Sequence, residues 1–304
     1  MAKKVILVGL DGANPVTFGK FMAEGSLPNF TRLTREGVWG SALAAPYGVT
    51  PVNWVGIATG ANPGTTGITG FLVHKPGDPL DKVGNGFTSD ACHAEFIWQA
   101  AERAGLKPAT ICYPGSLPKT ASSLYALGGT GFPGTNPQLQ VAASGCFSAG
   151  IEPDKIQNAK PLALRKPSDW PSLPSSLTPI AEAELAIQPS RPSLKPLSLH
   201  LLLARDSAGV PRAILARERH YAARLAECAV GRWSSWAKVE FASIPAFFRF
   251  KLVECSSDGS RVRLCHTQFL NPSDLSDPSD IGGQLFAEIG PLQQYVGHNT
   301  YSNA

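Results

Sequence analysis

The sequence has little charge, no run of basic residues and no long apolar stretch. Only 16% of its 304 residues are charged, and the formal net charge is +4. Nucleic-acid-binding proteins usually carry a cluster of lysine and arginine, and the absence of one here predicts no nucleic-acid partner. No stretch reaches the ~18–20 apolar residues that a membrane-spanning helix needs, so the sequence also predicts no membrane partner.

Clustered cysteines are missing as well. The six cysteines are Cys92, Cys112, Cys146, Cys228, Cys255 and Cys265. They occur singly and form no C-x-x-C pair, which favours reduced, mostly buried thiols. Cys255 and Cys265 flank a predicted turn and could face each other across a hairpin. With His266 beside them a zinc site is conceivable, although the usual spacing of structural zinc ligands is absent.

The N-terminus, MAKKVILVGLDG, carries two lysines before an apolar run and so resembles a signal peptide at first sight. The apolar run is short, however, and it ends at Asp11 without a small-residue cleavage site. We interpret residues 4–10 as the first core strand and expect a cytoplasmic protein.

The order of apolar segments predicts an α/β core. Lys4–Leu10 is almost continuously apolar, as expected for a strand that a parallel sheet buries on both faces. Asn14-Pro15 and Leu27-Pro28 are helix starts, and residues 38–44 are a short strand candidate. Because ligands bind at the carboxyl ends of parallel strands, Asp11 is placed where a metal-binding carboxylate would lie. The alternative is an aspartate in a tight turn before a helix.

The stretch VTPVNWVGIATGANPGTTGITGF, residues 49–71, contains the main candidate for catalysis. A threonine before a proline predicts a helix start, with Thr50 as the cap and Pro51 at the first helical position. The Thr50 hydroxyl would then lie at the positive end of a helix, where phosphate binds and a hydroxyl loses its proton more easily. Thr50 is either a nucleophile or a plain N-cap. Asn53 either binds a phosphoryl oxygen or is a solvated first-turn amide.

Three segments together resemble a known family: VILVGLDGANP, GSLPNFTRLTREGVWG and TPVNWVGIATGANPGTTGITGF. They are similar, in order and spacing, to the type I phosphodiesterase and nucleotide pyrophosphatase branch of the alkaline phosphatase superfamily. The resemblance implies that Asp11 binds a metal ion and that Thr50 is both the nucleophile and a metal ligand. It also implies two divalent ions, with zinc expected, and a small-molecule phosphoester substrate.

The sequence departs from this family at two positions and also lacks part of the family's metal-ligand set. Thr66-Gly67-Ile68 stands where the family often has His-Gly-Ile, and Phe71 stands where the nucleotide-hydrolysing branch has an asparagine. The Asp-x-x-x-His and Asp-His pairs that complete the family's two-metal site are not found. The alternative is therefore a truncated or degenerate, non-catalytic relative that binds an anionic or phosphorylated ligand at the Thr50 helix. The oligomeric state stays open.

The resemblance and the apolar patterns together predict a mostly parallel sheet flanked by helices, like the alkaline phosphatase core, with an inserted, mainly antiparallel β subdomain. We expect the α/β core at 1–137, the insertion at 138–270 and a return to the core at 271–304. Within the insertion, residues 198–217 and 245–269 predict two hairpins. Residues 151–196 are rich in proline and serine and are interpreted as a long connection or the edge of the insertion.

Overall fold

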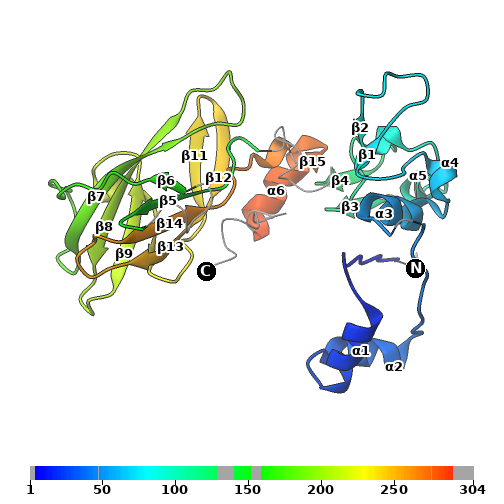
Figure 1. The fold of residues 1–304 in the computed structure, drawn as a ribbon, viewed down its shortest axis with the longest axis horizontal. Coiled ribbons are helices and arrows are strands. Elements are labelled where there is room, and N and C mark those ends of the chain that lie inside the picture. Colours follow the sequence, from blue (N-terminus) through cyan, green and yellow to red (C-terminus); the bar gives the residue numbers. More distant parts are fainter. Residues whose placement is uncertain (1–3, 47, 129–139, 152–158, 275, 290–304) are drawn as a thin grey trace. The chain divides into compact units, whose positions relative to one another are not determined.

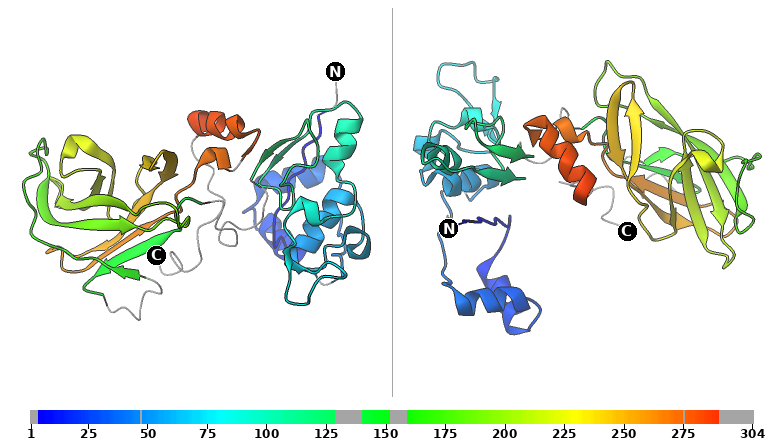
Figure 2. Two further views of the ribbon diagram at one scale, coloured as in Figure 1. Left: turned by 90° about the horizontal axis from the view of Figure 1, so that it is seen from above. Right: turned by 180° about the vertical axis from the view of Figure 1, so that it is seen from behind.

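The computed structural model describes residues 4–46, 48–128, 140–151, 159–274 and 276–289. The chain forms two compact units, Met1–Leu124 and Tyr125–Ala304 (Figures 1 and 2). The predicted boundary at 137/138 lies outside the described residues. Among the helices in the described part of the chain, none is long and apolar enough to cross a membrane.

In the described residues, the N-terminal unit contains α-helices α1 to α5 and three short strands. Its helices are α1 (Pro15–Ala23), α2 (Pro28–Glu36), α3 (Thr50–Thr59), α4 (Pro63–Thr66) and α5 (Ile97–Arg103), with a 3₁₀ turn at Ser89–Ala91. Its strands are β1 (Leu72–Val73), β2 (Gly84–Asn85) and β3 (Ala109–Ile111), and β1 pairs with β2 antiparallel. The predicted start of α1 is confirmed, because the Asn14 side chain accepts hydrogen bonds from the N–H groups of Val16 and Thr17.

The predicted first strand is wrong. Residues 4–10 are extended but belong to no sheet, and the side chains of Val5 and Ile6 are 88% and 86% exposed. The strand candidate at 38–44 is likewise unpaired. An apolar segment becomes a buried strand only where neighbours pair with its backbone and cover both faces, and the described residues provide neither. The mixed α/β character is confirmed, whereas a mostly parallel core sheet is not.

The C-terminal unit contains two four-stranded sheets packed face to face (Figures 1 and 2). One has the order β10-β9-β8-β7 and is antiparallel throughout. The other has the order β13-β14-β5-β6, in which β5 and β6 run parallel. The strands are β5 (Gly145–Ala149), β6 (Ala159–Pro161), β7 (Thr178–Ile187), β8 (Leu197–Arg205), β9 (Pro211–Ala216), β10 (Arg224–Ala229), β13 (Phe250–Cys255) and β14 (Val262–His266).

The core of this unit lies between the two sheets. Leu201 and Leu215 come from one sheet and Phe147 and Leu264 from the other, and all are buried in one cluster. The hairpin of β11 (Ala237–Phe241) and β12 (Ile244–Phe248) adds Phe241 and Phe248 to that cluster. The antiparallel character predicted for the insertion is therefore found, and both predicted hairpins are present.

One detail of the insertion differs from the prediction: the continuous strand expected over 245–255 is divided at Arg249 into β12 and β13. Residues 151–196 were interpreted as a long connection or the edge of the insertion. They contain β7, a ten-residue strand that forms one edge of its sheet. The remaining elements are β4 (Tyr125–Leu127), a 3₁₀ turn at Tyr221–Ala223, a second at Pro272–Asp274, β15 (Ser276–Asp277) and α6 (Ser279–Ile289).

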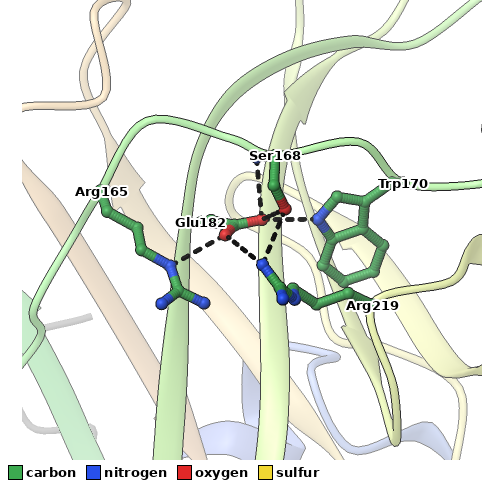
Figure 3. Close-up of polar contacts among 5 residues, drawn as sticks. All are labelled: Arg165, Ser168, Trp170, Glu182 and Arg219. Atoms are coloured by element: carbon green, nitrogen blue, oxygen red, sulfur yellow. Dashed lines mark hydrogen bonds and ion pairs between the residues drawn. The ribbon is translucent and has the colours of Figure 1, made fainter.

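A buried carboxylate fastens a loop to the outer face of the β7–β9 sheet (Figure 3). Glu182 on β7 is 2% exposed, and it accepts hydrogen bonds from the indole of Trp170 at 2.8 Å and from Arg165 Nε at 2.8 Å. The hydroxyl and N–H of Ser168 donate at 2.9 and 3.2 Å, and Arg219 lies at 3.5 Å. Trp170 thereby covers a second apolar cluster on the face that points away from the main core.

Candidate functional site

Thr50 is the first residue of α3. The N-cap is Val49, with φ −94° and ψ 151°, and Pro51 follows Thr50 in the first turn. The prediction that Thr50 caps the helix with its hydroxyl is therefore wrong by one position. The Thr50 hydroxyl makes no hydrogen bond with any described residue, so the helix does not use it for its own capping. The half-buried hydroxyl is left available to a ligand at the positive end of α3.

The rest of α3 is held firmly in its unit. Pro51, Val52, Val55 and Ala58 are buried on one side of the helix. The helix ends at Gly60, whose φ of +67° is a left-handed conformation that glycine adopts without strain. Thr50 therefore starts a helix whose position is fixed by packing.

Asp11 lies against α3. The indole N–H of Trp54 donates a hydrogen bond to Asp11 Oδ1 at 3.2 Å. Trp54 follows Thr50 by four residues, so the two side chains project from the same side of the helix. Gly9 packs closely against the same ring. Any other residue at this position would place its Cβ atom 2.1 Å from ring carbons of Trp54. The structure thus brings Asp11 to the Thr50 side of α3, although the segment before it is not a strand.

Tyr113 holds Trp54 from the other direction. Its hydroxyl donates to the backbone oxygen of Trp54 at 2.9 Å, and the two rings meet edge to face with centroids 5.0 Å apart. Burial raises the pKa of Tyr113 to about 12, so the hydroxyl stays protonated and keeps donating at neutral pH. Sequence reasoning did not assign a role to Trp54 or Tyr113. The one sequence feature that could have pointed to Trp54 is its position one helical turn after Thr50, the candidate nucleophile.

Asn53 ties the preceding loop to the first turn of α3. Its side-chain oxygen accepts from the N–H of Ala45 at 2.8 Å, and its amide nitrogen donates to the oxygen of Val49 at 3.0 Å. The alternative of a merely solvated amide is therefore wrong. The amide nitrogen carries two hydrogens, so one remains after the bond to Val49. A contact from Asn53 to a phosphoryl oxygen stays a prediction.

The two departures from the family pattern have local packing roles. Thr66 is buried at the end of α4, where its hydroxyl donates to the oxygen of Pro63 and accepts from the N–H of Ile68. Phe71 meets Phe87 edge to face, with ring centroids 5.5 Å apart.

The described residues do not complete a metal site. No group of three or more histidine, cysteine, aspartate or glutamate side chains is gathered anywhere in the described ranges. Asp11 and Thr50 offer one carboxylate and one hydroxyl, whereas zinc in proteins is usually held by three or four side chains. The suggestion that Cys255 and Cys265 face each other across a hairpin is also wrong. Cys255 pairs with Val262, and Cys265 faces Cys146 on β5.

Comparison with known families gives one match. The family described as type I phosphodiesterase / nucleotide pyrophosphatase matches residues 5–170, a little over half of the 304 residues. The chain belongs to this family, as the sequence motifs implied. The matched part contains Asp11, Thr50 and Asn53. No curated protein and no solved structure matched the chain.

Proposed function

We propose that the protein is a phosphoester hydrolase whose nucleophile is the Thr50 hydroxyl. The observation that carries the proposal is that Thr50 begins α3 with a hydroxyl not bonded to any described residue, within the part matched by the family. In the reaction the Thr50 oxygen attacks phosphorus in line with the leaving group. A Thr50–phosphorus bond forms as the bond to the leaving oxygen breaks, and water later releases the product.

The residues around Thr50 support this chemistry. Backbone N–H groups in the first turn of a helix lack partners within the helix, and the dipole of α3 favours negative charge at this end. The remaining amide hydrogen of Asn53 is a further donor. Asp11 is held on the same side of α3 by Trp54. Asn53 and Trp54 position the groups that act on the phosphoester.

The substrate class that we propose is a small-molecule phosphodiester or nucleotide pyrophosphate, acted on in the cytoplasm. Two divalent metal ions, zinc by family resemblance, belong to this proposal, with Asp11 and Thr50 as two of their ligands. These two oxygen donors alone are too few to hold an ion.

The test is a comparison of initial rates on bis(p-nitrophenyl) phosphate for the parent, Thr50→Ala and Thr50→Ser, with zinc present and absent. Loss of a nucleophile typically lowers the rate by several orders of magnitude, so we expect at least a ~1,000-fold loss for Thr50→Ala. Thr50→Ser keeps a hydroxyl and should retain measurable activity. Thr59→Ala, at the other end of α3, is the matched control. Equal rates for the parent and Thr50→Ala would refute the proposal.

The lack of a three-ligand group in the described residues favours a second candidate. In it the protein does not turn over substrate but binds a phosphorylated or other anionic ligand at the start of α3. Titration calorimetry with inorganic phosphate and with AMP, in the absence of metal, distinguishes the two. Binding without turnover supports the second candidate, and turnover that requires Thr50 supports the first.

A further inference from the structure

Two thiols face each other across neighbouring strands of the C-terminal unit. Cys146 on β5 and Cys265 on β14 are direct partners in the antiparallel register, and their sulfur atoms are 3.0 Å apart. Both residues are buried, with exposures of 4% and 1%. Directly opposed residues in antiparallel strands have Cα atoms ~4.5–5.5 Å apart, which falls within the range that a disulfide can span.

The pair lies on the outer face of its sheet. Phe147 and Leu264, the chain neighbours of the two cysteines, point into the main core. Because side chains alternate along a strand, Cys146 and Cys265 point the other way. They form a separate small cluster, against which Ile151, Ala159 and Val253 pack. Reaching the thiols therefore requires displacing this small cover and leaves the packing between the two sheets intact.

The surroundings favour a reactive thiolate at one of the two sulfurs. The hydrogen bond from Cys265 lowers the pKa of Cys146, burial opposes this, and the charge of Arg263 adds to the lowering. Lys251 lies beside Cys265 in the register of β13 and β14. The pKa of Cys265 is raised by its bond to Cys146 and by burial, so Cys265 keeps its proton. Because the Cys265 thiol donates its hydrogen to the Cys146 sulfur at 3.0 Å, we assign Cys146 as the attacking sulfur and Cys265 as the resolving one.

We propose that Cys146 and Cys265 form an oxidative modification site, at which a hydroperoxide such as hydrogen peroxide converts the two thiols into a cross-strand disulfide. The Cys146 sulfur attacks one peroxide oxygen, the O–O bond breaks, and a sulfenic acid forms as water leaves. The Cys265 sulfur then attacks the Cys146 sulfur and displaces its hydroxyl as a second water. Two thiols lose two electrons in total, and one peroxide is reduced to two waters.

Cys228 provides a matched comparison. It is buried to a similar degree, at 3% exposure, but it belongs to the main core between the sheets. Burial raises its pKa to about 11, which makes it a poor nucleophile. Cys112 is exposed and reports whether the oxidant was active. The proposal therefore predicts oxidation of the Cys146–Cys265 pair while Cys228 stays reduced.

The experiment treats the purified full chain with hydrogen peroxide in native buffer, alkylates the remaining thiols after denaturation, and maps the peptides without reduction. We expect one linked pair of peptides, containing Cys146 and Cys265 and lighter by two hydrogens, with Cys228 alkylated. In urea the same treatment should give a mixture of pairings, because the register no longer selects a partner. A native sample that oxidises Cys112 but gives no Cys146–Cys265 link, or links another pair, would overturn the proposal.

Two variants assign the roles within the pair. Cys265→Ser should abolish the link and leave a sulfenic acid at Cys146 that reacts with dimedone. Cys228→Ser should give the link in the same yield as the parent. Dimedone labelling at Cys265 in a Cys146→Ser protein, equal to that at Cys146 in Cys265→Ser, would contradict the order of attack.

Discussion

The carboxylate of Glu182 gives the most quantitative prediction. Burial by itself would raise its pKa, but the hydrogen bonds from Trp170 and Ser168 and the charge of Arg165 outweigh burial and lower the pKa from 4.5 to about 2. Each pKa unit corresponds to ~1.4 kcal/mol, so the folded C-terminal unit gains roughly 3 kcal/mol from this group near neutral pH. Glu182→Gln keeps the shape of the side chain and removes the charge.

We expect Glu182→Gln to lose about 3 kcal/mol of unfolding free energy at pH 7. Its amide N–H₂ would face the N–H donors that now bind the carboxylate, which adds to the cost. The sign of the pH dependence follows from the depressed folded pKa. The stabilisation is complete above the unfolded pKa near 4.5 and is lost as pH falls toward about 2. The difference between parent and variant should therefore shrink by roughly 1 kcal/mol at pH 3.5.

The assay is urea unfolding followed by the β-sheet circular dichroism signal, at pH 7 and at pH 3.5. Glu184→Gln is the matched control, because Glu184 lies two residues along the same strand but is exposed. That variant should change stability by less than ~0.5 kcal/mol. If Glu182→Gln and Glu184→Gln unfolded at the same urea concentration, the stabilising role of the buried network would be refuted.

Two further predictions concern the N-terminal unit. Asn53→Ala removes the hydrogen bonds to Ala45 and Val49, so it should lower the free energy of unfolding by about 1–2 kcal/mol and raise the proteolysis rate of the loop before Thr50. Asn62→Ala is the control, because the side chain of this N-cap residue makes no capping hydrogen bond, and it should have neither effect. Zinc titration of the 304-residue chain should give weak binding, because Asp11 and Thr50 alone are too few ligands. Tight binding of two ions per chain by calorimetry would show that further ligands exist.

Local signals in the sequence predicted the helices well. Asn14 and the prolines at the starts of α1, α2 and α3 act through a few neighbouring atoms, and the helices begin within a residue or two of the expected positions. The antiparallel hairpins of the C-terminal unit were also predictable, since alternation and turn residues such as Asp258-Gly259 specify them locally.

Features that depend on distant partners could not be predicted in the same way. Residues 4–10 have the composition of a buried strand, but whether they become one depends on segments elsewhere. β7 was missed because the surrounding residues 151–196 are rich in proline and serine and show few clear periods. The burial of Glu182 on this strand depends on Trp170, Ser168 and Arg165, which surround it. Cys146 and Cys265 are 119 residues apart, so nothing local indicates their pairing.

Asp11, Thr50 and Asn53 were proposed as site residues from the sequence, and all three lie within residues 5–170, the part that the family matches. The contacts that support them were not predicted. The contact of Trp54 with Asp11 and the hydrogen bond from Tyr113 join segments 43 and 59 residues apart, and only the folded chain reveals them. These supports explain how an aspartate outside any strand still reaches the helix that begins with Thr50.

The most direct test of the central claim is the identity of the residue that becomes covalently modified during turnover. The parent protein would be mixed with saturating bis(p-nitrophenyl) phosphate, quenched rapidly in acid and mapped by peptide mass spectrometry. Attack by Thr50 predicts a nitrophenyl phosphate adduct on the peptide that contains Thr50, and none in Thr50→Ala. An adduct on another residue, or an unmodified Thr50 peptide while a burst of nitrophenol is released, would contradict the account.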